Sequence, residues 1–266
     1  MFFFPFSDDN PSGTKPYGCY GIIVLCVFFF FWQSSLPPDL LNQAVNNFGV
    51  VPVELIGNQE NSIPPSLTIF TSMFMHGGWL HLIGNMVFLW IFGDNVEDAM
   101  GRFKFIFFYL LCGALAALLQ SIIDPASNIP MIGASGAIAG VLGAYLLLHP
   151  RANINVLVWI IIFISVIRVP AFIVLGFWII SQFFSGAISD TSSGGVAYFA
   201  HIGGFAAGMA LIAFFKHPNV KMFQEAHSYA FEKKEFSDFM DYGIPNKKAS
   251  NFMDEFIDKA NNNKDK

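Results

Sequence analysis

The sequence predicts an all-α membrane protein with six membrane-spanning helices. Of its 266 residues, 54% are hydrophobic and only 12% are charged. Several apolar segments are long enough to cross a bilayer core of about 30 Å, which takes about 20 helical residues. In addition, the Lys and Arg residues fall in alternate connections between these segments, as the positive-inside tendency of multi-pass proteins predicts. Most of the chain is therefore expected to lie in the lipid bilayer.

The apolar segments divide the chain into three parts. Residues 1–17 form a short N-terminal segment, residues 18–215 carry the spans, and residues 216–266 form a charged tail. No basic region precedes the first apolar residues and no small-residue cleavage pattern follows the first span, so we expect no removable signal peptide. The six spans are predicted at residues 18–36, 79–93, 103–123, 133–149, 171–187 and 197–215.

Two segments lie outside this pattern. Residues 153–169 are apolar, but Arg168 and Pro170 separate them from the next span. Since a full crossing here would break the alternation of basic connections, we predict an interfacial or re-entrant segment. The tail is rich in Lys, Asp, Glu and Asn with scattered aromatic residues, which favours one or two short amphipathic helices followed by a disordered end.

The basic residues predict the orientation of the spans. The connections at 37–78, 124–132 and 188–196 contain acidic residues but no Lys or Arg. Positively charged connections tend to stay on the cytoplasmic side of a membrane. We therefore expect both termini in the cytoplasm and these three connections outside.

Three polar residues of the spans share one depth. Ser135, His201 and His81 each stand 15 or 16 residues before the charged residue at the cytoplasmic end of their span. At 1.5 Å per helical residue, each lies about 22 to 24 Å from the cytoplasmic boundary. Alone, Ser135 is more simply a helix cap or a packing residue, whereas an ionisable group such as His201 is costly at this depth and usually functional. Their shared depth favours a common site.

Small residues indicate that the fourth and sixth spans lie side by side. Gly136 and Gly140 are four residues apart in the fourth span, and Gly204 and Gly208 are four apart in the sixth. Glycine at this spacing lets helix backbones approach closely. If the spans pack through these faces, the serine and the histidine at their outer ends come within reach of each other.

The sequence disfavours a transporter or channel, and it disfavours a metal site. A transporter or channel would need polar groups continuing toward the cytoplasmic side, but below Asn85, Ala139 and Gly208 the spans are apolar. A metal site would need ligands at regular spacing, and the three cysteines lie inside apolar runs without it. We therefore expect neither a metal nor a cofactor.

Three motifs carry a resemblance to a known family. They are FMHGGWLHLIGNMVFLWIFGDNVEDAMG (74–101), GASGAIAGVLGAY (133–145) and AYFAHIGGFAAGM (197–209). In this order they resemble the rhomboid intramembrane serine proteases of the six-span bacterial type. The resemblance covers about residues 15–215 and rests on the three motifs together, because GxSG or GxxxG alone would be a weak signal.

The resemblance implies a serine–histidine dyad. Ser135 would be the nucleophile and His201 the base that takes its proton, since a serine hydroxyl needs an adjacent base. His81 and Asn85, with the backbone N–H of Ser135, would bind the oxyanion. His76 would have a structural or supporting role.

The remaining matches are glycines, and two positions depart from the family pattern. Gly133 would permit a tight turn before the fourth span, and the four glycines of the two facing spans would be packing residues. Some family members have a tyrosine four residues after the serine that stacks on the histidine, but this chain has Ala139. Because of Ala139, another group must orient His201. The tryptophan–arginine pair that many members have in the first outer loop is absent as well, since that region reads SLTIFTSMFMH.

The function implied by the resemblance is hydrolysis of peptide bonds in or near transmembrane segments of other membrane proteins. The expected partners are such substrates and the bilayer, with no nucleic acid, and the expected location is a bacterial inner membrane. The alternative within the same fold is an inactive rhomboid-like protein that binds and escorts membrane proteins. The presence of both Ser135 and His201 argues against that alternative.

Overall fold

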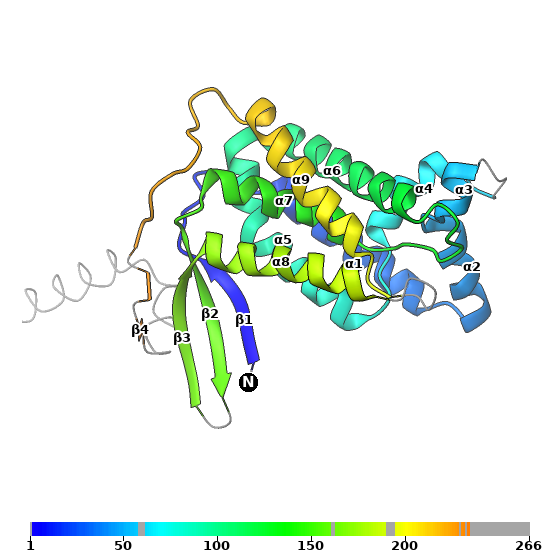
Figure 1. Cartoon of the computed structure of the whole chain (residues 1–266), viewed down its shortest axis with the longest axis horizontal. Helices are drawn as coiled ribbons and strands as arrows, with labels where there is room; N and C mark the ends of the chain where they lie inside the picture. The colour runs from blue at the N-terminus through cyan, green and yellow to red at the C-terminus, as the bar shows by residue number, and fades with distance from the viewer. Residues whose placement is uncertain are drawn as a thin grey trace, which may run out of the picture.

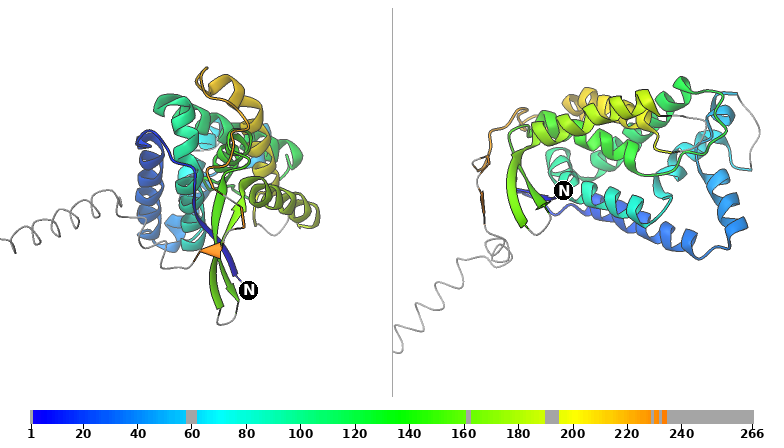
Figure 2. Two further views of the ribbon diagram at one scale, coloured as in Figure 1. Left: turned by 90° about the vertical axis from the view of Figure 1, so that its left-hand side faces the viewer. Right: turned by 60° about the horizontal axis from the view of Figure 1, so that its bottom comes forward.

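The computed structural model shows a bundle of long helices with a small sheet at one end and short helices at the other (Figure 1). Figure 2 shows the same two ends from other directions. The structure describes residues 2–57, 62–160, 163–189, 195–228, 230–231 and 233–234.

The long helices lie at the six segments predicted to be spans, and α5 continues past residue 93, where the second span is predicted to end, to Met100. Among the described residues, four of them are long and apolar enough to cross a membrane, and α7 is a shorter apolar helix. The remaining one, α5, carries Asp94, Glu97 and Asp98 toward its end. The bundle is therefore that of a multi-pass membrane protein. Its helices are α1 (Tyr17–Ser34), α5 (Trp79–Met100), α6 (Arg102–Ile123), α7 (Ser135–Leu148), α8 (Ala171–Ile188) and α9 (Tyr198–Phe215).

The long connection between α1 and α5 contains short helices of its own. Pro38 and Pro65 stand at the first positions of two of them, where the fixed φ of proline suits a helix start and its missing N–H has no consequence. The elements are α2 (Pro38–Phe48), α3 (Pro52–Gly57), α4 (Pro65–Thr71) and the 3₁₀ helix η1 (Ser72–Phe74).

A four-stranded antiparallel sheet corrects the all-α prediction. The stretch at 153–169, for which an interfacial or re-entrant segment is predicted, forms a β-hairpin, in which Leu157 pairs with Val166 on one side and with Phe4 on the other. The hairpin is rich in Val and Ile, which favour strands because a branched side chain fits a pleated surface. The fold is therefore mostly helical. The strands, in sheet order, are β1 (Phe2–Asp8), β2 (Asn153–Ile160), β3 (Phe163–Pro170) and β4 (Lys233–Lys234).

The N-terminal segment and the tail both pack on the bundle at the sheet end. Tyr145 of α7 donates a hydrogen bond of 2.5 Å from its hydroxyl to the carboxylate of Asp8. In the tail, the backbone N–H of His217 donates to the carbonyl of Ala99 at 2.8 Å. The described residues between 216 and 234 form turns, extended segments and β4, so the predicted amphipathic helices are not found there. The rest of the tail lies outside the described residues.

The helices α7 and α9 approach each other through glycine. A Cβ atom at Gly204 would overlap the carbonyl oxygen of Gly136, and one at Gly208 would overlap that of Gly140. Only a residue without a side chain allows backbones to come this close. These contacts hold α7 against α9 just beyond the first turn of α9, which carries His201.

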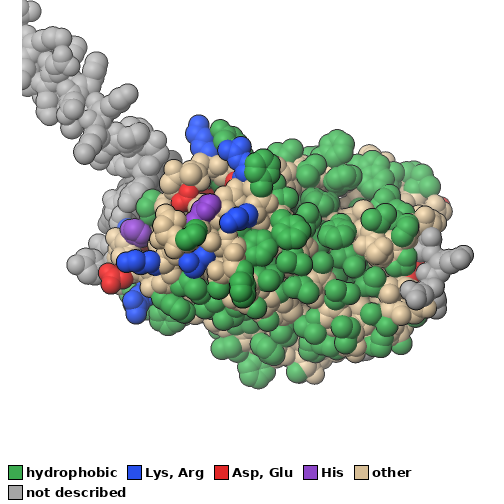
Figure 3. All heavy atoms as spheres, turned by 90° about the horizontal axis from the view of Figure 1, so that it is seen from above, with side chains coloured by type: hydrophobic (Ala, Val, Ile, Leu, Met, Phe, Trp, Pro, Cys, Tyr) green, Lys and Arg blue, Asp and Glu red, His purple; other side chains and the backbone are tan. Residues whose placement is uncertain are grey.

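Charge is distributed unevenly along the bundle. Figure 3 shows Lys and Arg side chains gathered at the sheet end of one face, while the rest of that face is mainly hydrophobic. Arg102 begins α6 and Lys216 follows α9, so the basic residues stand where the long helices begin or end at the sheet. The opposite end carries the site predicted from sequence.

Candidate active site

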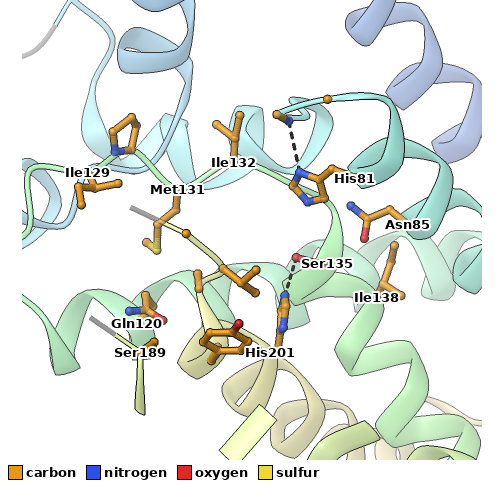
Figure 4. A pocket seen from close by; sticks show the side chains of 18 of the residues that line it. His81, Asn85, Gln120, Ile129, Met131, Ile132, Ser135, Ile138, Ser189 and His201 are labelled. Atoms are coloured by element: carbon orange, nitrogen blue, oxygen red, sulfur yellow. Dashed lines mark hydrogen bonds between the residues drawn. The ribbon is translucent and has the colours of Figure 1, made fainter. Parts of the chain in front are cut away.

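A cavity of about 1150 Å³ lies among α5, α7, α8 and α9, and the connections before α7 and α9 close part of it. Four of the residues predicted for the site line it: His81, Asn85, Ser135 and His201. Figure 4 shows His81 and His201 on opposite sides of Ser135. Residues that are up to 120 positions apart in the chain are thus brought to one place.

The serine and the histidine are in hydrogen-bond contact. Ser135 is the first residue of α7, and His201 lies in the first turn of α9. The distance from Ser135 Oγ to His201 Nε2 is 2.8 Å, within the normal range for a hydrogen bond. The start of α9 is itself held by α6, because the N–H of Ala200 donates to Gln120 Oε1 at 3.2 Å.

A second contact of His201 involves a residue that is absent from the site predicted from sequence. Gln182 of α8 places its Oε1 at 2.8 Å from His201 Nδ1. The sequence gives only an approximate depth for it, because Gln182 lies 12 residues after Pro170, or about 18 Å from the sheet end at 1.5 Å per residue. Depth alone does not show which face of α8 meets α9. One turn earlier, the ring of Trp178 lies 5.8 Å from the His201 ring. An aromatic ring thus lies near His201 although Ala139 removes the expected one.

His81 holds its ring toward Ser135 from the other side. The backbone N–H of Gly77 donates to His81 Nδ1 at 3.2 Å. Because that nitrogen accepts a hydrogen bond, the proton of the neutral ring is on Nε2. This Nε2 would lie 2.7 Å from a Cβ atom built on Gly133. Position 133 therefore requires glycine for two reasons: the ring of His81 leaves no room for a side chain, and the backbone has a φ of +131°.

Asn85 and the start of α7 supply further hydrogen-bond donors. Asn85 is 8% exposed, and its side-chain nitrogen has no hydrogen-bond partner within the described part of the chain. A buried donor without a partner costs about 1–3 kcal/mol. Ser135 begins α7, and the first N–H groups of a helix have no intrahelical acceptor. The Asn85 amide and the first N–H groups of α7 could therefore donate hydrogen bonds to an oxygen atom of a ligand beside the serine.

His76 lies next to His81 and outside the contacts of the serine. Its ring centroid is 5.1 Å from that of His81, and its backbone is held by Gln33, which accepts from the His76 N–H at 3.0 Å and donates to its carbonyl at 3.3 Å. Neither ring nitrogen has a partner within the described residues. His76 therefore packs against His81.

No metal site accompanies these residues in the part of the chain that the structure describes. There, no group of three or more His, Cys, Asp or Glu side chains is arranged to hold a metal ion. What the arrangement provides is a hydroxyl in contact with an imidazole, with hydrogen-bond donors on the other side of that hydroxyl. These are the groups that acyl transfer needs.

Comparison with known proteins assigns the family. The Rhomboid domain family matches residues 66–218. Rhomboid-like protein 11, chloroplastic, of Arabidopsis thaliana is 28% identical over 176 residues, which are 62% of this chain and 58% of that protein. Rhomboid protease GluP of Bacillus subtilis is 29% identical over 196 residues, 73% of this chain and 34% of that protein.

A third relative has a similar degree of identity. Rhomboid-related protein 1 of Caenorhabditis elegans is 31% identical over 206 residues, 71% of this chain and 51% of that protein. The chain thus spans between about a third and about three fifths of the length of these three relatives. Because the domain match covers more than half of the 266 residues, the chain belongs to the rhomboid family.

Proposed function

We propose that this protein is an intramembrane serine protease that cleaves peptide bonds in or near transmembrane segments of other membrane proteins. The observation that carries the proposal is the 2.8 Å distance between Ser135 Oγ and His201 Nε2 inside the cavity. An adjacent base of this kind turns a weakly nucleophilic serine into a reactive one. The similarity to a protein named as a rhomboid protease supports the same function.

In the proposed reaction, His201 Nε2 accepts the hydroxyl proton of Ser135 while Oγ bonds to the carbonyl carbon of the substrate. The carbonyl oxygen becomes an oxyanion, which His81 Nε2–H, the Asn85 amide and the Ser135 backbone N–H would stabilise. His201 then gives the proton to the leaving amine as the C–N bond breaks, and an acyl ester remains on the serine. Water then gives a proton to His201 while its oxygen bonds to the acyl carbon. As the ester C–O bond breaks, His201 returns the proton to Ser135 Oγ, and the carboxylic acid product leaves.

The position of the cavity supports a membrane-protein substrate. It lies at the end of the bundle away from the basic side chains, and apolar residues such as Ile138, Leu142 and Trp178 share its lining with the polar groups. The carbonyls of a transmembrane helix are already hydrogen-bonded, so a substrate must unwind locally before it can be cut. Small or helix-breaking residues near the outer end of its span would make this easier.

The proposal includes a membrane orientation. All six long helices span a bacterial inner membrane, with the sheet, the N-terminal strand and the tail in the cytoplasm. The cavity then opens toward the outer side, where water for hydrolysis is available.

Cleavage by the purified protein tests the proposed function. The protein in liposomes is mixed with a fluorescent model substrate that has one transmembrane helix with a Gly-Ala segment near its outer end. We expect a single cut by the wild type and no detectable cut by Ser135→Ala. Binding of the substrate without cleavage by the wild type would overturn the proposal and support the inactive escort protein instead.

A further inference from the structure

Gln182 is in contact with the nitrogen of His201 that faces away from the serine. The side chain is only 9% exposed, and its Oε1 is 2.8 Å from His201 Nδ1. The imidazole therefore makes one hydrogen bond with Ser135 and one with Gln182. Which of its nitrogens carries the proton depends on which atom of the Gln182 amide faces it.

The other contacts of the Gln182 amide settle its orientation. Its Nε2 lies 3.0 Å from Ser181 Oγ and 3.3 Å from the backbone carbonyl of Trp178. The Ser181 hydroxyl gives its own proton to the same Trp178 carbonyl at 2.6 Å, so its oxygen is an acceptor for the amide. Both neighbours accept, which requires the NH₂ group on that side. The oxygen of the amide is left to face His201.

This orientation determines the tautomer of the histidine. An amide oxygen can only accept a hydrogen bond, so His201 Nδ1 must carry the ring proton. In a neutral imidazole the other nitrogen, Nε2, is then unprotonated and can accept the proton of Ser135. With the amide reversed, the proton would sit on Nε2 and the histidine could not act as a base.

We propose that Gln182 is a positioning residue, which holds His201 in the tautomer and ring orientation that proton transfer from Ser135 requires. This inference rests on the proposed protease function. In soluble serine proteases an aspartate holds the catalytic histidine in this way. Inside a membrane an ionised carboxylate is costly, and an amide oxygen supplies the same acceptor without a charge. Ser181 and the Trp178 carbonyl keep that oxygen turned toward the ring.

Variants of Gln182 give the kinetic test. Gln182→Leu removes the acceptor, and we expect kcat on the model substrate to fall about 10- to 100-fold with KM changed less than about twofold. Gln182→Glu keeps an acceptor oxygen and should recover most of this loss. Ser185→Ala, one turn further along α8, is the matched control and should keep the wild-type kcat.

A spectroscopic readout separates positioning from a purely structural role. The ¹⁵N spectrum of histidine-labelled protein distinguishes protonated from unprotonated ring nitrogens, and the His201 signals are assigned by their loss in His201→Asn. We expect protonated Nδ1 and unprotonated Nε2 in the wild type, and a mixture of both tautomers in Gln182→Leu. Ser181→Ala keeps Gln182 but frees its amide, so it should give a partial mixture and a smaller loss of kcat.

Each result decides for or against the inference. A wild-type kcat in Gln182→Leu, or a tautomer that does not change in either variant, would overturn it. If Gln182→Leu does not fold, the inference is tested by Ser181→Ala alone, through the tautomer of its His201 and its kcat. Because the spectrum needs no substrate, a wild type that cleaves nothing would refute the protease function and leave the effect of Gln182 on His201 measurable.

Discussion

At the scale of single residues, the two histidines nearest the serine hold their protons on opposite nitrogens. His81 accepts from the N–H of Gly77 at Nδ1 and therefore presents Nε2–H to the cavity. His201 faces the oxygen of Gln182 at Nδ1 and therefore presents an unprotonated Nε2 to Ser135. One ring is thus suited to donate to a developing oxyanion and the other to accept a proton. A contact at the other nitrogen, with the Gly77 backbone in one ring and the Gln182 amide in the other, accounts for this difference.

The donors around the serine give a prediction at this scale. Asn85→Ala should lower turnover about 10²- to 10³-fold, because an oxyanion donor acts mainly on the transition state. Binding of uncleaved substrate should change little. Turnover by the purified variant in liposomes measures the effect, with Ile83→Ala, a half-exposed position on the same helix, as control. Unchanged turnover in the double variant His81→Ala/Asn85→Ala would remove both residues from the mechanism.

At the scale of elements, the helices could be predicted from sequence and the sheet could not. Length and hydrophobicity locate a helical span, because an isolated strand cannot satisfy its backbone in lipid. The same measures do not distinguish a helix from a strand at 153–169, and the strands that pair there come from residues 2–8 and 233–234. Gln182 is a similar case, since its contact with His201 depends on how α8 is rotated against α9.

The glycine contact between α7 and α9 gives a prediction about elements. Gly204→Ala should separate the two helices, because its Cβ would overlap the carbonyl of Gly136. A displacement of about 1 Å at a catalytic pair can cost about 10²-fold in rate. We expect a lower thermal midpoint in detergent and at least a tenfold loss of turnover.

The matched control for this variant is Gly176→Ala. Gly176 lies in α8, and a Cβ atom there would meet no other atom within 4 Å. Alanine is a better helix former than glycine by about 1 kcal/mol, so stability and turnover should be kept or improved. Equal behaviour of the two variants would show that close packing of α7 and α9 is unimportant.

At the scale of the whole molecule, the sheet joins three parts of the chain at the basic end of the bundle. The N-terminal strand, the hairpin between α7 and α8, and the tail all contribute to it. The site lies at the other end, within the first turns of α7 and α9. The sequence predicts that the site lies away from the charged end, because Ser135, His201 and His81 each stand 15 or 16 residues before the charged residue that ends their span. The hydrogen bond between Ser135 and His201 depends on how α7 packs against α9, so it is seen only in the tertiary structure.

The orientation of the molecule in its membrane can be tested by labelling. In a background without the three buried cysteines, a single cysteine at Asn128 should react with an impermeant thiol reagent in intact cells. One at Asn219 should react only after the cells are opened. Both positions are exposed in the structure, so access to solvent does not differ between them. Labelling of the Asn219 variant from outside would reverse the proposed orientation.

The central claim, an activated Ser135, is tested most directly by a serine-reactive fluorophosphonate probe. The probe reports an activated hydroxyl rather than any hydroxyl, and activation needs the imidazole that lies 2.8 Å away. We expect covalent labelling of the purified wild-type protein at Ser135 alone, located by mass spectrometry, and none in Ser135→Ala or His201→Ala. An unlabelled wild type, or labelling that survives His201→Ala, would contradict the dyad.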